Sequence, residues 1–208
     1  MALSYPLSLP ATGIFAEMDI HANSAVGMSR SPFTAEEQVY AHPGEWLEAD
    51  IVLPPMARTD AAAWITFLTA LNGREGTFLM GDPMGTSPQG NWGGSPKVFG
   101  AHAVQVKTIA MDGFTASTGT VTGGDWIQRG SGTTTHLHMV TKSATADGSG
   151  LLTLEIWPRL RVALADNDTF VTADTVGIWR LASNRRSWSL REASSYGLRF
   201  SAEEALNA

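Results

Sequence analysis

The chain has 208 residues, of which 43% are hydrophobic and 16% are charged, and it contains 21 glycines and 10 prolines but no cysteine. Such a composition indicates a folded chain with many turns, and it excludes disulfide bonds and sites built from cysteine thiolates. The formal net charge of −6 lies in residues 1–75, which hold nine acidic and three basic residues, so this part lacks the cationic face that nucleic-acid binding requires.

Membrane and secretion signals are not found. No apolar run reaches the ~18 residues that cross a bilayer, and residues 1–13, MALSYPLSLPATG, lack the basic start and continuous apolar core of a signal peptide. We therefore expect a soluble protein that is made inside the cell and does not associate with a membrane.

The segment EWLEADIVLPP (45–55) alternates between apolar and polar residues. This period of two predicts a half-buried strand that ends at Pro54 and Pro55. The predicted core face carries Leu47, Ala49, Ile51 and Leu53. The opposite face carries Trp46, Glu48, Asp50 and Val52.

One clear helix follows this strand, with Thr59 or Asp60 as its predicted N-cap. Apolar residues recur in it at helical spacing: Ala61, Trp64, Ile65, Leu68 and Leu71. Gly73 suits the left-handed position just after the helix. Residues 76–83, GTFLMGDP, then predict a short strand.

Residues 81–100 are too rich in Gly, Pro and Ser for regular structure, and they predict a boundary. Beyond it, strand-like pieces separated by turn clusters indicate a small barrel or sandwich. These pieces are residues 101–111, 125–130, 135–142 and 151–158. Alternation in the C-terminal part, which includes Trp188 and Leu190, predicts strands that return to the N-terminal sheet.

The predicted fold is mainly β with one clear helix, an α+β fold in two parts. Residues 1–82 and 166–208 are expected to form a discontinuous β-sandwich or barrel. Residues 83–95 are the expected Gly/Pro/Ser-rich linker, and residues 96–165 an inserted small β module.

The sequence predicts neither a catalytic nor a cofactor site. The glycines of residues 73–85 follow a helix, whereas a phosphate-binding loop needs them before one, and no G-x-S-x-G turn presents a nucleophile. We therefore expect a protein that is not an enzyme and holds no cofactor.

The sharpest metal candidate is the sequence His-Leu-His at residues 136–138. Alternate residues of a strand point to one face, so His136 and His138 can share a cation. No third ligand is evident, because Asp125 and Asp147 lie in turn-like segments where Asp commonly bonds its own backbone. The alternative is a polar strand face without a metal.

Two of the seven tryptophans, Trp64 and Trp188, fall on predicted apolar faces and are expected in the core. Trp92 lies in the segment GNWGG. An aromatic residue in such a loop is typical of an interface anchor, which makes Trp92 an interface candidate.

Four consecutive features of the sequence together resemble a known family. They are the strand with its acids, the proline turn, the helix DAAAWITFLTALNG (60–73) and the segment REGTFLMGDP (74–83). They are similar to the distal tail proteins of long-tailed, siphovirus-like bacteriophages and gene transfer agents. In that family a helix ending in F-hydrophobic-x-x-x-x-G leads into a strand G-x-F-x-x-x-D. The matching residues here are Phe67, Gly73, Gly76, Phe78 and Asp82. The resemblance covers about residues 40–200, and residues 1–39 lie outside it.

This resemblance implies a structural virion protein of the tail, made in the cytoplasm of the bacterial host. Distal tail proteins form a ring, usually a hexamer, that joins the tail tube to the tail tip or baseplate through a tube-like belt domain. The implied partners are copies of the chain itself, the tail-tube protein, the tail-tip hub and the tape-measure protein. DNA is expected to pass through the ring without specific binding.

Two alternatives stay open. A tail-tube subunit shares the sheet-and-helix core, although an inserted module weighs against the stacked layers of a tube. A tail-associated carbohydrate-binding or hydrolase module needs coplanar exposed aromatic residues or polar groups that converge on a pocket.

Charge suggests where a ring would form its contacts. A ring of identical subunits needs two complementary surfaces on each copy, and the N-terminal acids can meet residues 159–199, which hold seven arginines and four acids. The interface candidates are Glu36, Glu37, Trp92, Arg185 and Arg186, and Glu45 is expected at the interface or in the bore.

Glu48 and Asp50 are the residues expected to line the bore. They share the non-core face of their strand, and carboxylates there would repel phosphate so that DNA slides. A plain solvated face is the alternative interpretation.

Overall fold

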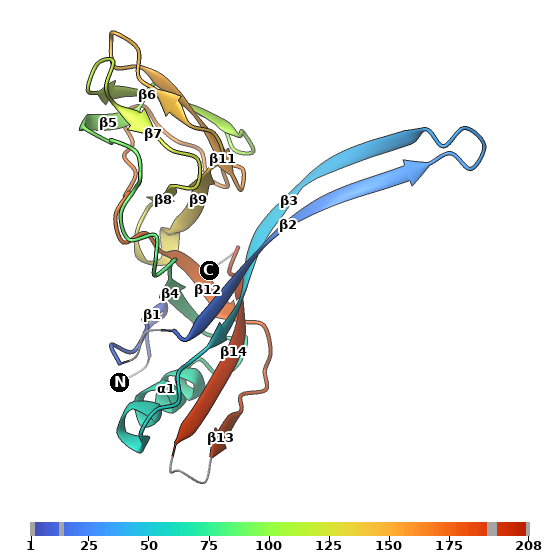
Figure 1. The fold of residues 1–208 in the computed structure, drawn as a ribbon, viewed down its shortest axis with the longest axis vertical. Coiled ribbons are helices and arrows are strands. Elements are labelled where there is room, and N and C mark those ends of the chain that lie inside the picture. The colour runs from blue at the N-terminus through green and yellow to red at the C-terminus, as the bar shows by residue number, and fades with distance from the viewer. Residues whose placement is uncertain (1–2, 13–14, 191–194, 207–208) are drawn as a thin grey trace.

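The computed structural model describes residues 3–12, 15–190 and 195–206 of the chain (Figure 1). Strands account for 44% of the chain and helical turns for 8%, so the expected mainly β, α+β fold is confirmed. The strands form one seven-stranded, one five-stranded and one two-stranded sheet.

The seven-stranded sheet, here called the body sheet, joins the two ends of the chain. Its strands are β1 (Leu7–Ser8), β2 (Glu17–Arg30), β3 (Glu37–Val52), β4 (Thr77–Met80), β12 (Gly177–Leu181), β13 (Trp188–Leu190) and β14 (Tyr196–Glu204). They lie in the order β1-β4-β12-β14-β3-β2, and β13 pairs with β14. β14 pairs antiparallel with β3, which places Phe200 beside Ile51. The C-terminal strands therefore return to the N-terminal sheet, as predicted.

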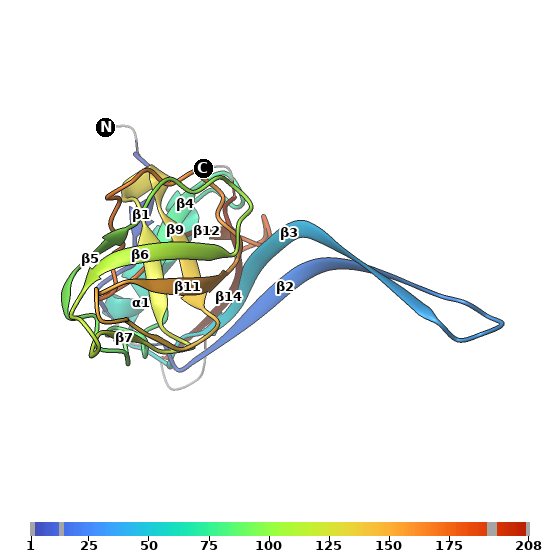
Figure 2. The same ribbon diagram turned by 90° about the horizontal axis from the view of Figure 1, so that it is seen from above.

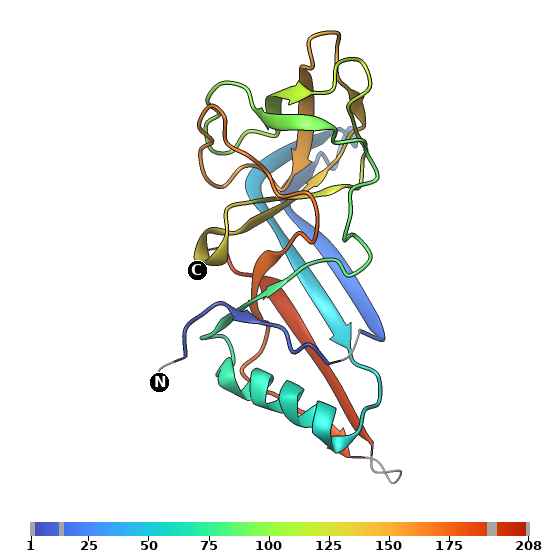
Figure 3. The same ribbon diagram turned by 90° about the vertical axis from the view of Figure 1, so that its left-hand side faces the viewer.

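The alternation of β3 determines which face is buried. The predicted core residues Leu47, Ala49, Ile51 and Leu53 are each at most 2% exposed. The helix α1 (Arg58–Ala70) covers this face (Figure 3), and the ring of its Trp64 lies 6.1 Å from that of Phe200. Burying a large apolar side chain contributes roughly 1.5–3 kcal/mol, so the helix and the sheet stabilise each other.

α1 begins earlier than predicted. Its N-cap is Ala57, in an extended conformation (φ −68°, ψ 163°) with no side-chain cap, so the expectation of Thr59 or Asp60 was wrong. The reason is tertiary, because Met56 forms a bridge with Tyr196 and the chain turns immediately after it. At the other end Asn72 takes the first left-handed position (φ 48°), and Gly73 (φ 72°) follows it.

The inserted module contains the five-stranded sheet, in the order β5-β6-β11-β9-β8, and the pair β7–β10. Its strands are β5 (Gly94–Val98), β6 (Thr108–Phe114), β7 (Thr120–Val121), β8 (Trp126–Arg129), β9 (His136–Val140), β10 (Ala144–Thr145) and β11 (Leu152–Trp157). A 3-10 turn, η1 (Gly132–Thr134), joins β8 to β9. The module has an apolar core of its own, which includes Ile109, Ile127 and Leu154. Leu137 instead packs into the core of the body and ties the two parts together.

The chain passes between the two parts twice. The irregular segment between β4 and β5 spans residues 81–93. The carboxylate of Asp125 holds it by accepting hydrogen bonds from the backbone N–H of Gln89 (2.7 Å) and Gly90 (3.1 Å). On the way back, residues 160–171 still pair with the module, so the body sheet resumes at Gly177 and not at residue 166. Local composition does not reveal such pairing between distant segments.

β2 and β3 continue beyond the body as a long two-stranded arm (Figures 1 and 2). Their register shifts where Ala25 of β2 faces residues 42–44 of β3. Pro43 has no N–H to donate at this point, which interrupts the ladder of hydrogen bonds. Residues 26–41, here called the arm, follow this break. The sequence analysis assigned no structure to this region, so the arm was not predicted.

One predicted core position was wrong. Trp188 is 46% exposed, and Leu190 is more exposed still. Both lie on β13, a short strand at the edge of the body sheet, where alternation continues but the core ends. Trp64, in contrast, is buried as predicted. Among the described residues no helix has the length and apolar character needed to cross a membrane.

Candidate functional site

The face of the body sheet opposite α1 gathers acidic side chains from three strands. Residues paired across antiparallel strands point to the same side of a sheet. Glu48 is paired with His21 and Glu203, Asp50 with Asp19 and Ser201, and Val52 with Glu17 and Arg199. The five carboxylates on this surface, here called the acidic face, are Glu17, Asp19, Glu48, Asp50 and Glu203.

The two residues expected in the bore, Glu48 and Asp50, both lie on the acidic face. Glu48 accepts a hydrogen bond from the indole N–H of Trp46 at 2.9 Å. Asp50 accepts one from the hydroxyl of Ser201, and the Nε2 of His21 lies 3.5 Å from its carboxylate. These partners hold the carboxylates in place but do not neutralise the face.

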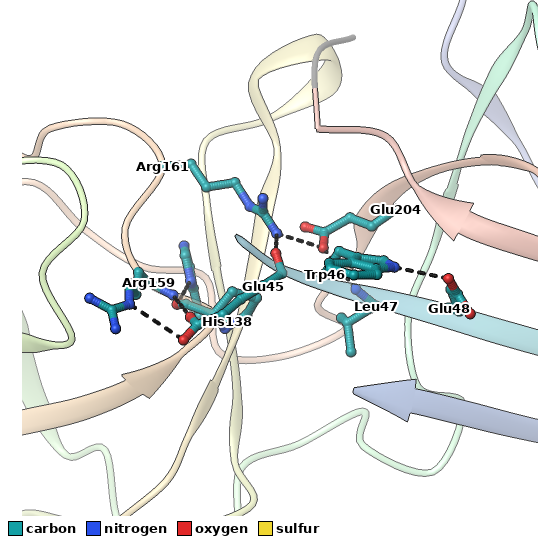
Figure 4. A network of polar contacts seen from close by, with 9 residues as sticks. Glu45, Trp46, Leu47, Glu48, His138, Arg159, Arg161 and Glu204 are labelled. Atoms are coloured by element: carbon teal, nitrogen blue, oxygen red, sulfur yellow. Dashed lines mark hydrogen bonds and ion pairs between the residues drawn. The ribbon is translucent and has the colours of Figure 1, made fainter. Parts of the chain in front are cut away.

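Glu45 lies on the other side of β3, in a buried ionic network between the body sheet and the module (Figure 4). Its side chain is about 4% exposed and accepts hydrogen bonds from Lys107 Nζ (2.8 Å) and from the backbone N–H of Arg159 (2.7 Å). The Nε of Arg159 lies 3.4 Å away. Burial alone would raise the pKa of Glu45, but the hydrogen bonds from Lys107 and Arg159 outweigh it and hold the pKa below its usual value.

Arg161 extends this network to the C-terminal strand. One of its terminal nitrogens donates to the backbone carbonyl of Glu45 (2.9 Å) and to the carboxylate of Glu204 (2.7 Å). The same oxygen of Glu204 accepts a hydrogen bond from the backbone N–H of Leu47 (3.2 Å). Burial raises the pKa of Glu204, and Arg161 opposes that shift only in part.

This network corrects the expectation for Glu45. The sequence analysis expected Glu45 at a subunit interface or in a bore, whereas it is buried within one chain. Some of the predicted attraction between N-terminal acids and later arginines is therefore used inside the subunit, by Glu45 and Arg159. The sequence alone did not predict the burial of Glu45, because the residues that donate hydrogen bonds to its carboxylate, Lys107 and Arg159, lie more than 60 residues away along the chain.

The His-Leu-His sequence forms most of β9, but its two histidines differ. His138 is buried, and its Nδ1 lies 2.8 Å from the carbonyl oxygen of Pro158, so Nδ1–H donates to that oxygen. Burial lowers the pKa of His138 to about 4. His136 is half-buried, and burial together with Arg161 and Arg129 lowers its pKa.

Among the described residues, His136 and His138 belong to no group of three or more His, Asp or Glu side chains that could hold an ion. Asp147 accepts hydrogen bonds from Ser149 and Leu151 in its own turn, as its local sequence indicates. Asp125 binds backbone N–H groups of the segment after β4. His138 is therefore a buried polar residue of the module rather than part of a solvated strand face.

Trp92, the interface candidate in the glycine-rich loop, is half-buried. Its ring packs against that of Phe114 at 5.5 Å, and its indole N–H donates to Asp125 at 3.3 Å. The glycine-rich loop folds back onto the module, so part of the Trp92 side chain belongs to that core, and its role at an interface stays a prediction.

The remaining interface candidates lie at different places in the molecule. Glu36 and Glu37 lie at the tip of the arm, where Arg30 Nε approaches Glu37 at 3.6 Å. Arg185 and Arg186 follow β12 and line a hollow beside β14. The acidic and basic candidates are thus separated in one chain, because the arm points away from the body (Figure 1).

The arm also exposes an apolar face that the sequence analysis missed. Val26, Met28 and Val39 share this face and are 55%, 65% and 62% exposed. Phe33 at the tip is 95% exposed. The sequence does contain a signal for this hairpin. Segments in which apolar and polar residues alternate flank the turn sequence SPFTAEE (31–37), and this pattern is typical of a hairpin.

No protein-family model matches this chain, and no curated protein matches it. Three surfaces of the molecule bear on what it can do. These are a sheet with an acidic face, an arm with an exposed apolar face, and a module held to the body by an ionic network.

Proposed function

We propose that this chain is a structural subunit of a closed ring in a bacteriophage tail, a distal tail protein that joins the tail tube to the tail tip. The observation that carries the proposal is the arm of residues 26–41. A two-stranded hairpin is marginally stable in water, and an exposed apolar face marks an interaction surface. An arm of this kind requires a partner surface.

A second copy of the chain is the partner that the proposal assigns to the arm. When each copy offers an arm and a different surface that receives it, identical contacts repeat around an axis and can close into a ring. The long outer strand β2 adds an open strand edge, which a neighbouring copy can cover.

The acidic face is the surface that the proposal assigns to the bore. Five carboxylates on it face three guanidinium groups, those of Arg74, Arg180 and Arg199. A bore lined with excess carboxylates repels DNA phosphates, so DNA passes without binding tightly. The resemblance of residues 60–83 to distal tail proteins supports the same role.

The arm provides the first test. In the shortened variant, Asn-Gly replaces residues 27–40 and joins Val26 to Ala41 through a two-residue turn. The full chain is expected to form a ring with the mass of about six copies, and the shortened chain a folded monomer. Sedimentation measures the mass, and electron microscopy images the ring.

A pair of point variants provides the matched control. Met28→Ser removes an exposed apolar side chain from the arm, whereas Met84→Ser removes one from the segment after β4. Met28→Ser is expected to weaken the ring and Met84→Ser to leave it unchanged. A full chain that stays monomeric and forms no ring in particles contradicts the proposal, and a ring with a basic bore contradicts the assignment of the acidic face.

The alternatives predict other results. A tail-tube subunit shares this core and forms many stacked rings, so its copy number per particle separates it from a distal tail protein that forms one ring. A carbohydrate-binding module needs several exposed aromatic residues. The exposed aromatic residues among the described ones, Phe33, Tyr40, Phe99 and Trp188, are divided between the arm, the module and β13.

A further inference from the structure

The end of the body sheet at β13 lies away from the arm (Figure 1). Two neighbouring hollows lie at this end. One has a volume of about 420 Å³ and lies beside β14 and the segment after β12. The other, of about 490 Å³, lies between the end of β3 and β13. Both are lined by Val52, Ser187 and Arg199, so they adjoin, and together they are here called the groove.

The groove combines apolar surface with positive charge. Its apolar lining includes Val52 and Leu198, and three arginines reach it: Arg185, Arg186 and Arg199. Asp50 is the carboxylate among its lining residues. Asp50 and Arg199 also belong to the acidic face, so the groove begins where the surface assigned to the bore ends. Within the described part of the chain none of these three arginines forms an ion pair. The groove therefore suits a ligand with an apolar side chain and a carboxylate.

The tip of the arm has this chemistry. Its turn is ordered by Ser31, whose hydroxyl oxygen accepts hydrogen bonds from the backbone N–H of Phe33 (3.3 Å) and Thr34 (3.2 Å). The turn presents the ring of Phe33 to solvent. Glu37 faces Arg30, whereas Glu36 forms no ion pair within the described residues. A free carboxylate thus lies three residues from an exposed aromatic ring.

We propose that the groove of one copy binds the arm tip of the next, with Phe33 on the apolar lining and Glu36 against Arg185 and Arg186. This inference rests on the proposed ring and identifies the contact that builds it. Residues 26–33 extend about 25 Å at the usual rise of a strand, far enough to cross a subunit boundary. The groove lies beside β13, and the arm leaves the body away from β13 (Figure 1), so a second copy has to supply the contact.

Cross-linking tests this contact directly, because the chain has no cysteine of its own. A variant with Glu36→Cys and Arg186→Cys, treated with a short bis-maleimide, is expected to give a ladder of covalently joined chains. The control combines Glu36→Cys with Lys97→Cys on β5 of the module, and is expected to stay unlinked under the same conditions. A mixture of chains that carry only Glu36→Cys with chains that carry only Arg186→Cys is expected to give cross-linked dimers and no longer products.

A charge exchange tests the same contact without cysteine. Arg186→Glu and Glu36→Lys are each expected to weaken self-association by about tenfold or more, and the double variant to recover most of that loss. The matched control is Lys97→Glu, which makes the same charge change on the module. Phe33→Ser is a second arm variant in case Glu36→Lys perturbs the turn, and it is also expected to weaken association.

The outcomes separate this inference from the proposed function. A ring that assembles normally in Arg186→Glu and gives no cross-link overturns the inference and leaves the ring intact. A chain that is monomeric at every concentration overturns both. Binding of duplex DNA that depends on Arg186, without any cross-link from the arm, assigns the groove to DNA and also overturns the inference.

Discussion

Glu45 is the residue at which the body sheet, the module and the arm meet. It lies next to the break in the β2–β3 ladder, and its donors come from Lys107 in the module and Arg159 just after β11. Removing one partner of a buried ionic group is costly, because the other groups stay buried without their counter-charge. The base of the arm is therefore fixed by residues far away in the sequence.

Glu45→Gln is expected to lower the free energy of unfolding by about 2 kcal/mol, because a hydrogen bond to a charged partner contributes roughly 1.5–3 kcal/mol. Glu48→Gln, on the opposite face of the same strand, is the control and is expected to change stability by less than about 0.5 kcal/mol. Urea unfolding measures both. Equal losses in the two variants would contradict the role assigned to the network.

His138 predicts how stability depends on pH. Its pKa falls from an ordinary value of 6.5 to about 4 on folding, because burial disfavours the charged ring. The neutral ring therefore supports the fold fully above pH 6.5. That contribution is lost as the pH falls from 6.5 towards 4, where the unfolded chain binds a proton that the folded chain does not.

Between pH 7 and pH 4 the free energy of unfolding is expected to fall by about 3 kcal/mol because of His138, since one pKa unit corresponds to about 1.4 kcal/mol. His138→Gln keeps a donor for the carbonyl of Pro158 but does not titrate, so its stability is expected to fall less over the same range. Urea unfolding of both proteins at several pH values gives the difference. Parallel pH profiles would show that His138 is not the titrating group.

At the scale of elements, α1 has an N-terminus that its sequence does not cap. Ala57 has the extended conformation of an N-cap but no oxygen to accept a bond from the first turn. Ala57→Ser is expected to raise the free energy of unfolding by about 1 kcal/mol, the usual contribution of such a cap. Ala57→Val, which adds no acceptor, is the control, and a similar gain with Val would contradict the explanation.

The arm is the element whose stability depends most on its surroundings. It has an exposed apolar face, and in the described structure it contacts the rest of the chain chiefly through its base. Hydrogen bonds that are not covered by other layers open readily, so amide exchange in the free subunit is expected to be fast along residues 26–41.

At the scale of the whole molecule, assembly is expected to slow that exchange. In the ring, amides of residues 26–41 are expected to exchange at least about tenfold more slowly than in the subunit, because a neighbour covers them. Amides of the buried β3–β14 pair, such as those of Ile51 and Phe200, serve as the internal control. Hydrogen–deuterium exchange at protein concentrations above and below assembly provides the measurement. Unchanged exchange in the arm of an assembled ring would contradict its place at the interface.

The sequence by itself determined those features that depend on neighbouring residues. The alternation at residues 47–53 places one set of side chains in the core, and the spacing around Trp64 gives α1 its buried face. The mainly β class follows from the same local patterns, as does the shared face of Glu48 and Asp50. These predictions succeeded because a strand or helix positions its own side chains at fixed intervals.

Only the tertiary structure decided what each of those faces meets. Alternation gives Glu45 the same side of β3 as Leu47, but the basic groups that make its burial tolerable come from residues 107 and 159. Trp188 continues an apolar pattern beyond the edge of the core, and Trp92 packs against Phe114 of the module. Burial and ion pairing depend on segments distant in sequence, and local periodicity carries no information about which segments these are.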